Sequence, residues 1–510
     1  MTLRRPAHLL GWTPGRLRAP LGLPWELLQM VFEYFVLRCG ISRHRLRTLL
    51  CGNALDMVPL PHVAIRRDIL RAVCHDWQVA ASANTSLWQD IELAPQVNVE
   101  ALAEVLLRSG SRPLRIHCYY TTPARSRKPF AAGSGNMSPC MVTSSAAHIS
   151  AALRTLQNAH QRWESLTLYT NHHLLVNVCL ETMFSDTSRC AHVKTLQVVF
   201  TGALDLSGSL PRHLHLALPA PMRLECMVPL TSLSLCACRV DWALLAGLLA
   251  SSLRSLQLAH ILNFLPVTEF FDILAASSNL QELHIAGVFM RLDGDVLAEP
   301  VPEEKRVALP ELRRLCLAAL YVSHASHVLR TLHLPRLHEL WLDLPYQKTV
   351  VPPCDFLDVV ALLLESEPAV PLRSLQVLSI RALGFGYAEG KDHIMHTFFA
   401  TLRDITHIYL DFSCLQAVVW RWLVEACADG YLQALRTLTV SGMSVLDVQE
   451  MILMRRQAGH DDIRLYMLFP EDARELRAPR QWLAWVKHNT SLFRAINLAE
   501  AHEDLYPSFY

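Results

Sequence analysis

The stretches LTSLSLCAC (230–238) and LRSLQLAHI (253–261) share one pattern, which decides the fold of this 510-residue chain. In each, a leucine is followed three positions later by a second leucine and two positions after that by a third. The last two leucines alternate with a variable residue, so their side chains lie on the same face of a short strand. The first leucine fills the same core from the preceding turn. The pattern therefore predicts a short, half-buried strand entered from a tight turn.

This pattern returns along most of the chain. Between Leu230 and Leu435 the intervals from one start to the next are 23, 27, 32, 25, 38, 30 and 30 residues. An ordinary α/β protein whose strands happen to begin with leucine would not give eight such copies in sequence. The other clear copies begin at Leu280, Leu312, Leu337, Leu375, Ile405 and Leu435, looser copies at Trp163 and Val193, and degenerate ones at Trp88 and Leu114.

Apolar, helix-like segments separate the copies. Strand and helix alternating in this way resemble the leucine-rich repeat, whose fingerprint is LxxLxLxx(N/C). The resemblance implies an α/β fold over residues 94–476, a curved solenoid of strand–turn–helix repeats whose strands line the concave face. The clearest helical segments are WALLAGLLAS (242–251), VTEFFDILAAS (267–277), CDFLDVVALLLES (354–366) and LQAVVWRWLVEACADG (415–430).

Two segments depart from the repeat. Residues 121–145 are rich in Pro, Gly and Ser and lack periodicity, which predicts a long flexible loop. The stretch RQWLAWVKHNTSLFRAINL (480–498) predicts a helix, because the last repeat of a solenoid needs a cover for its core. We therefore expect a C-terminal helical cap over 477–510.

The segment LPWELLQMVFEYF (23–35) predicts an amphipathic helix near the start of the chain. Pro24 suits the first helical position, where its missing N–H costs nothing, and Glu26 favours the positive end of the helix. The apolar side chains recur at helical spacing. Leu27, Val31 and Phe35 form one stripe, with Leu28 and Phe32 beside it.

A second helix is predicted over LRAVCHDWQVAA (70–81). The pair Leu87–Trp88 follows it, directly before the first Ile-x-Leu strand. The residues expected to share one face of this helix are Leu70, Val73, Cys74 and Trp77.

At these residues the chain resembles an F-box protein, in the style of the large F-box families of mushroom-forming fungi. The family's motif opens with Leu-Pro, Glu and a Leu/Ile-rich helix, and later gives a Val-Cys-x-x-Trp helix and a Leu-Trp pair. The resemblance implies an all-α F-box domain over 21–93 and leaves 1–20 as an N-terminal tail. The matching residues are Leu23, Pro24, Glu26, Leu27, Leu28, Phe32, Val73, Cys74, Trp77, Leu87 and Trp88.

The two helices are separated more widely than is usual in the family, by the insert 36–69. This insert is locally basic and predicts a short extra helix over RHRLRTLL (43–50), followed by a loop bounded by Pro59 and Pro61. It is either a tolerated surface excursion, since loop-closure entropy rises slowly with length, or the mark of a module that no longer binds its adaptor.

The resemblance implies a substrate-recruiting subunit of an SCF-type (cullin–RING) ubiquitin ligase. The F-box would dock on a Skp-type adaptor while the repeats hold a protein substrate, so the chain would supply proximity, use no cofactor and not be an enzyme. The competing hypothesis is a leucine-rich-repeat scaffold that binds proteins outside any ligase. The implied adaptor-binding residues are Leu23, Pro24, Leu27, Leu28, Phe32, Val73, Cys74 and Trp77.

The variable residues of LxxLxL would point out of the concave face, where a substrate would bind. The early strands offer small polar groups, whereas the later ones offer Trp341 and Tyr409 among mixed charges, the composition of binding hot spots. The alternative is that a C-terminal element covers both rings and makes them core. The predicted substrate-binding residues are His284, Arg314, Glu339, Trp341, Asp343, Arg381 and Tyr409.

Composition excludes several other classes. The chain has 47 basic and 46 acidic residues and no long Lys/Arg run, so we expect no nucleic-acid partner. No uncharged apolar stretch reaches about 18 residues, so we expect no membrane span. The 14 cysteines lack CxxC pairs and a secretory signal, which favours cytosol or nucleus. The four arginines before residue 25 faintly resemble a transit peptide, but an untidy tail fits better.

Catalytic and metal motifs are missing from the sequence. It has no GxxxxGK[ST] loop, GxSxG elbow or HExxH helix, and GFGYAEG (384–390) has the wrong spacing for a nucleotide loop. The pairs His324/His327 and His393/His396 form no four-ligand zinc set, and we interpret them as surface or helix-end histidines. An unrecognised enzyme would need a deep pocket that gathers several titratable groups, and we expect none.

Overall fold

Fourteen strands form a single parallel sheet that runs through the chain, and strand order in the sheet follows chain order. In this computed structural model the described residues are 25–38, 63–94, 98–120, 139–170, 175, 178–179, 192–200, 230–237, 242, 252–261, 265–288, 290–291, 306–344, 356–365, 370–381, 392–411, 417–441, 443–460, 462–469 and 479–497. The strands of this sheet are β1 (Asp90–Leu93), β2 (Leu114–Tyr120), β3 (Trp163–Thr170), β4 (Thr195–Phe200), β5 (Ser232–Cys236), β6 (Ser255–Ala259), β8 (Glu282–Ala286), β11 (Arg314–Ala318), β13 (Glu339–Asp343), β14 (Val377–Arg381), β15 (His407–Asp411), β16 (Thr437–Ser441), β17 (Arg464–Phe469) and β18 (Leu492–Asn497).

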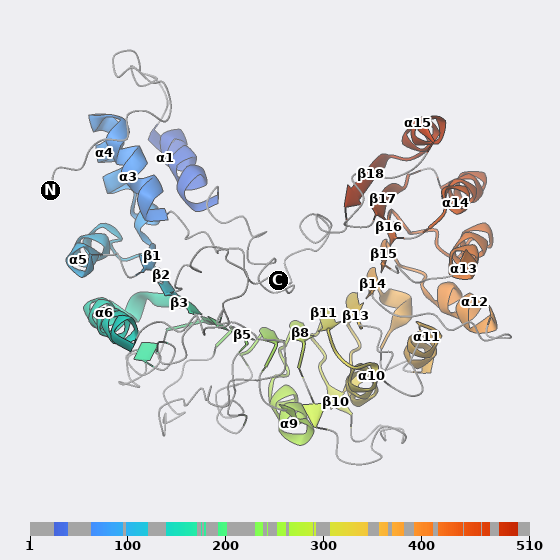
Figure 1. The fold of residues 1–510 in the computed structure, drawn as a ribbon, viewed down its shortest axis with the longest axis horizontal. Coiled ribbons are helices and arrows are strands. Elements are labelled where there is room, and N and C mark those ends of the chain that lie inside the picture. The colour runs from blue at the N-terminus through green and yellow to red at the C-terminus, as the bar shows by residue number, and fades with distance from the viewer. Residues whose placement is uncertain are drawn as a thin grey trace.

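Helices connect many of the strands and lie on one side of the sheet. In Figure 1 the strands line the inner side of an arc and the helices lie along its outer side. A mixed α/β arrangement of this kind is compatible with a repeat solenoid. The connecting helices are α5 (Val99–Arg108), α6 (Pro139–Gln157), α9 (Val267–Ala276), α10 (Val322–Thr331), α11 (Phe356–Glu365), α12 (Asp392–Thr401), α13 (Ala417–Ala428), α14 (Val445–Gln457) and α15 (Arg480–Asn489).

Short elements complete the described chain. Two small parallel pairs, β7 (Leu265–Pro266) with β9 (Met290–Arg291) and β10 (Val307–Ala308) with β12 (Leu332–His333), lie outside the main sheet. Ahead of the sheet stand the helices α1 (Trp25–Glu33), α3 (Val63–Val73) and α4 (His75–Ala83), with a π-helical turn η1 (Tyr34–Arg38) after α1. Single 3-10 turns are η2 (Thr85–Trp88), η3 (His160–Arg162) and η6 (Leu372–Ser374).

The strand register explains why the leucines of the repeat form one core. Leu283 pairs with Leu256 and with Leu315, and Leu315 pairs in turn with Leu340. Because the strands are parallel and unshifted here, equivalent leucines stack in rows on the helix-facing side, and all four are buried. The strands predicted at every repeat start, including the degenerate starts before Ile91 and at Leu114, are present.

A left-handed backbone residue follows four of the central strands. Ala237, His260, Gly287 and Ala319 have φ between 50° and 57°, and each comes directly after the last residue of its strand. Each backbone N–H donates to the carbonyl of the next strand's final residue, at 2.6–2.9 Å. Only glycine adopts this left-handed conformation without steric cost, so the alanines and the histidine adopt it because the turn requires it. The same turn geometry after four strands indicates a common repeat structure.

Two predicted boundaries are corrected. Residues 139–145, expected in a flexible loop, belong to α6, since Pro139 suits the first turn of a helix and the sequence behind it is helix-forming. In the described part of the expected cap, 479–497, only Arg480–Asn489 is helical, because the alternating apolar residues after it form β18, which extends the sheet. The predicted extra helix at 43–50 lies outside the described residues, as do 121–138 and most of 242–251.

The helix expected over 70–81 is two helices. Cys74 has φ −160° and ψ 171°, an extended backbone that ends α3 and starts α4. The helix α3 begins at Val63, before the predicted start at Leu70. Residues 63–69, which the sequence assigned to the insert, therefore belong to this helix. Because the break changes the rotation of the chain between Val73 and Trp77, these residues do not share one helix face.

Candidate functional site

Phe32 and Trp77 are in contact across the insert. Their ring centroids are 4.9 Å apart at an interplanar angle of 59°, a tilted packing that aromatic rings favour. Phe32 is fully buried and Trp77 is half-buried. The N-terminal helices therefore share a small core of their own, made of Phe32, Val36, Leu70, Ala80, Ala81, Leu87 and Trp88.

Polar contacts tie α1 to the turn before β1. The Glu33 carboxylate accepts hydrogen bonds from the Ser86 hydroxyl and from the Asn84 amide. The Asn84 side-chain oxygen also accepts from the Ser86 backbone N–H at 3.1 Å, so it caps η2. These bonds join residues on both sides of the insert and fix α1 against the start of the sheet.

Trp88 joins the helical unit to the sheet. Its indole N–H donates to the Ala81 carbonyl at 2.9 Å, and the guanidinium groups of Arg67 and Arg108 lie 4.8 and 4.7 Å from its ring centroid. Burial lowers the pKa of Arg67, whose guanidinium donates to the Leu87 carbonyl. The Leu-Trp pair of the motif is thus part of the folded core.

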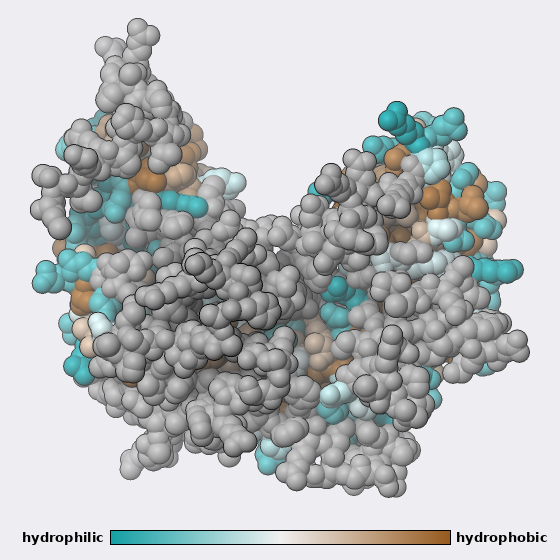
Figure 2. Space-filling view, in the orientation of Figure 1, coloured by the Kyte–Doolittle hydropathy of each residue, from teal (hydrophilic) through white to brown (hydrophobic). Residues whose placement is uncertain are grey.

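Large apolar side chains remain exposed on the helical unit. Singly exposed apolar residues are common on proteins, but a group of them on three packed helices is typical of a protein-binding surface. Figure 2 shows hydrophobic residues gathered over α1, at the upper left. We name this set the apolar surface; it consists of Leu27, Met30, Val31, Tyr34, Ile69, Val73 and Val79.

The implied adaptor-binding residues occupy different environments. Leu27 and Val73 are exposed at 45% and 44% and belong to the apolar surface. Phe32 is buried in the small core and can support a partner only indirectly. Half-buried positions are taken by Leu28, Cys74 and Trp77, while Leu23 and Pro24 lie outside the described residues.

The predicted substrate-binding residues lie on adjacent strands β8 to β15, and the charged ones among them form ion pairs. Arg314 on β11 donates to Glu282 on β8 at 2.9 Å and to both carboxylate oxygens of Glu339 on β13, at 2.9 and 3.2 Å. One row further, Arg381 on β14 donates to Asp343 on β13 at 3.3 Å. The mixed charges seen in the sequence therefore satisfy one another along the sheet.

The expectation that Trp341 and Tyr409 are exposed is wrong. Trp341 and Tyr409 are each 5% exposed, and His284 in the same row is 4% exposed. In a parallel sheet each of these side chains has neighbours about 4.8 Å away on both flanking strands. The row consists of His284, Cys316, Trp341, Ser379, Tyr409 and Thr439, and all six are buried, which agrees with the core alternative.

His324 and His327 are buried on α10, so their interpretation as surface histidines is wrong, while His324 does lie in the first turn of the helix. The Tyr321 ring meets His324 edge-on at 5.2 Å, and Phe271 of α9 meets His327 at 5.6 Å. Burial lowers the pKa of both imidazoles, and His327 lowers the pKa of His324 further. Among the described residues no group of three or more His, Cys, Asp or Glu side chains is placed to hold a metal ion.

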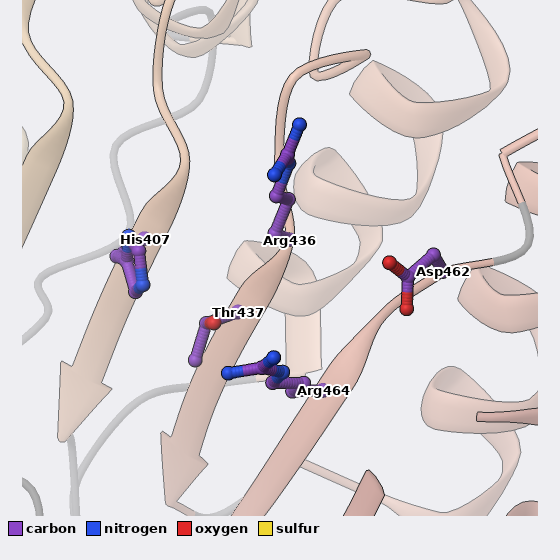
Figure 3. Close-up of a pocket in the computed structure, with 5 residues that line it drawn as sticks. All are labelled: His407, Arg436, Thr437, Asp462 and Arg464. Atoms are coloured by element: carbon purple, nitrogen blue, oxygen red, sulfur yellow. The ribbon is translucent and has the colours of Figure 1, made fainter. Parts of the chain in front are cut away.

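A basic cavity of ≈ 190 Å³ lies at the starts of β15, β16 and β17, and sequence reasoning did not find it. Figure 3 shows its five lining residues, His407, Arg436, Thr437, Asp462 and Arg464. Arg436 lies just before β16 and Arg464 begins β17, more than 25 positions further along the chain. Only the pairing of these two strands brings the two residues close together. The available signal in the sequence was an arginine one or two positions before the strand leucine, in LRTLTV and DIRLYM.

No helix in the described part of the chain is long and apolar enough to cross a membrane. No family model matches the chain, and no curated protein matches it. Among solved structures the chain is similar to one in a crystal structure of the Rad7 and Elc1 complex in yeast. That likeness has 14% sequence identity and a TM-score of 0.37, and covers 82% of this chain and 88% of that chain. At this TM-score the likeness carries no inference about function.

Proposed function

We propose that the chain is a substrate-recruiting subunit of an SCF-type ubiquitin ligase. Residues 21–93 dock on a Skp-type adaptor, and the repeat-like sheet holds a protein substrate near the ligase's catalytic subunits. The chain performs no chemistry of its own and acts by raising the local concentration of substrate at the ligase.

The apolar surface is the observation that carries this proposal. The helical unit exposes seven large apolar side chains to water. Burying them against a partner would gain a free energy of about 25 cal/mol for each Å² of apolar area removed from water. The surface lies on the same helices as the F-box-like motif, and Leu27 and Val73 belong to both. Below it, the Phe32–Trp77 contact holds those helices together despite the insert.

Co-expression of the full chain with a fungal Skp-type adaptor tests the proposal. The wild type is expected to carry the adaptor through size exclusion. Leu27→Glu and Val73→Glu place a charge on the apolar surface without opening the core, so each should release the adaptor. Leu446→Glu is the matched control, because Leu446 is 74% exposed on α14, far along the sheet.

A leucine-rich-repeat scaffold outside any ligase is the second candidate. The observation that favours it is the break at Cys74, which gives two short helices where the family motif suggests one. If the wild type is folded by circular dichroism and never retains the adaptor, the scaffold function replaces the ligase function.

A further inference from the structure

The main sheet ends in two edge strands that differ in how they are covered. At one end the residues of β1 are mostly buried, with Ile91 and Leu93 at most 1% exposed, and the helices α1, α3 and α4 stand beside that end (Figure 1). At the other end β18 pairs with β17 alone among the described strands. Leu492 is 39% exposed there, and Arg494 and Ala495 are exposed as well. The open edge of the described sheet is therefore β18.

The backbone of β18 directs hydrogen-bonding groups along this edge. The Ser491 N–H donates to the Ile463 carbonyl, just before β17, at 2.9 Å. Because the backbone groups of a strand alternate between its two sides, every second residue after Ser491 also faces β17. The intervening residues direct their N–H and C=O groups to the outer side, where no described strand lies; they are Leu492, Arg494 and Ile496. An edge of this kind can take up one more strand through backbone hydrogen bonds.

The side chains of β18 decide what an added strand should carry. On the helix-facing side Phe493 is half-buried, and the Trp482 ring of α15 meets it edge-on at 5.8 Å. An apolar side chain on an added strand would cover the outer side of this Phe493 ring. On the opposite face Arg494 is exposed and pairs in register with Tyr466. An acidic side chain at the matching position of an added strand would start about 4.8 Å from Arg494. Alternate positions of the partner should therefore be apolar and acidic.

The charge of the last described repeat favours an acidic partner. Residues 479–497 contain Arg480, Lys487 and Arg494 and no Asp or Glu. In the strand before them the opposite charges of Asp462 and Arg464 balance, so the edge as a whole remains positive. A second copy of this chain would bring the same cations to the same edge and be repelled, since charged edge residues prevent pairing between like edges. An acidic segment is attracted instead.

We propose that β18 binds an extended peptide segment with alternating acidic and apolar side chains, which joins the sheet as a further parallel or antiparallel strand. The inference deepens the proposed function, on which it rests for the identity of this segment as part of a recruited protein. It places recognition at the edge of the sheet rather than on its face, where the central residues His284, Trp341 and Tyr409 are buried.

Fluorescence anisotropy with short synthetic peptides tests the inference on the full chain, without any adaptor. The probe alternates glutamate with valine; one comparison peptide alternates lysine with valine, and another carries the glutamates and valines of the probe in shuffled order. We expect binding of the probe alone, weakening as the salt concentration rises. Methyl groups on alternate backbone nitrogens then test for a strand. Methylation of the set that faces β18 should abolish binding, and methylation of the other set should leave it unchanged.

The variant Arg494→Pro tests the edge itself. Proline removes the outward N–H of this residue and is tolerated on an edge strand whose N–H faces away from its neighbour. The affinity for the probe should fall at least about tenfold, because one backbone bond is lost and the ring obstructs the adjacent ones. Arg494→Gln is the matched control: it removes the same charge but keeps the N–H, so it should weaken binding less. Hydrogen exchange over 464–469 that matches the wild type shows that β17 and β18 stay paired.

Each other outcome overturns the inference. Equal binding of the shuffled peptide means a general acidic-peptide surface, equal binding of the lysine peptide means that charge does not select the partner, and no binding of the probe means no site. Equal effects of the two methylation patterns mean that the peptide does not join the sheet. Equal affinities of Arg494→Pro and Arg494→Gln place the binding elsewhere. Adaptor binding by these variants is measured separately, so failure of this edge and failure of the ligase function are distinguished.

Discussion

Phe32 and Trp77 lie on opposite sides of the 36–69 insert, yet their ring centroids are 4.9 Å apart. The insert therefore does not prevent the two halves of the motif from packing together. Loop-closure entropy grows only with the logarithm of loop length, so one aromatic contact with the surrounding small core can offset the longer connection. What the contact supports is the apolar surface, whose Leu27 and Val73 face solvent.

Replacing Phe32 with alanine should loosen the helical unit and leave the sheet intact. Deleting a fully buried phenylalanine costs about 3–5 kcal/mol, which corresponds to more than roughly a hundredfold faster amide exchange by local opening. We expect this acceleration over 25–38 and 63–83, measured by hydrogen–deuterium exchange. Phe398→Ala, at an equally buried ring on α12, is the control and should accelerate exchange around 392–411 instead. Unchanged exchange in Phe32→Ala would show that the small core does not hold the unit together.

Gly287→Ala should destabilise the middle of the sheet. Gly287 has φ 57°, and a Cβ atom there would collide with the His260 ring of the preceding repeat. The left-handed backbone costs alanine about 1 kcal/mol, and the collision adds an overpacking cost of about 1–3 kcal/mol. Gly459→Ala is a matched control, because Gly459 has φ 82° and no atom within 4 Å of the added Cβ.

Chemical denaturation followed by exchange at the level of single segments measures the difference between these two variants. Segment-level data are needed because a long repeat-like sheet does not unfold in one cooperative step. Gly287→Ala should open β6 and β8 more than Gly459→Ala opens α14. Equal effects would mean that His260 moves aside and that the repeats are not closely packed at this turn.

Acidification should weaken the packing around α10. The folded-state pKa of His324 and of His327 lies below the ordinary 6.5, mainly through burial, with His327 acting on the first and Arg330 on the second. The unfolded chain therefore binds more protons, so stability is full above pH 6.5 and falls as the pH decreases below it. The protection factors of the amides over 322–331, which correct the exchange rates for their intrinsic pH dependence, should fall from pH 7 to pH 5 in the wild type.

The variant His327→Gln removes one of the titrating groups and should flatten this pH dependence. His488→Gln, at an exposed position on α15, serves as the control and should leave the pH dependence unchanged. If the wild type shows no pH dependence over 322–331, the two imidazoles are not held neutral by their surroundings.

Local pattern was enough to predict the strands of the main sheet from β1 to β16, because each repeat contributes its own leucines to one core. Leu256, Leu283, Leu315 and Leu340 are all buried where the pattern places them. The helix break at Cys74 was not predictable in this way, since the apolar spacing continues through it. The start of α6 at Pro139 was hidden by the loop-like composition around it.

The candidate sites depended on tertiary contacts that periodicity does not contain. The sequence places Trp341 and Tyr409 on the sheet face, but their burial depends on what lies around them in the fold. Arg314 and Arg464 both begin a strand, yet only Arg314 has carboxylates in the neighbouring strands. Whether an arginine is neutralised is decided by register, and so the basic cavity emerged only from the structure.

Titration of the purified Skp-type adaptor against the full chain tests the central claim most directly. The wild type should bind. Leu27→Glu should raise the dissociation constant at least tenfold, because the introduced carboxylate would be desolvated in the interface without a partner. Leu446→Glu should bind as the wild type does. Equal affinity for Leu27→Glu, Leu446→Glu and the wild type, or no binding by any of them, would contradict docking of this helical unit on the adaptor.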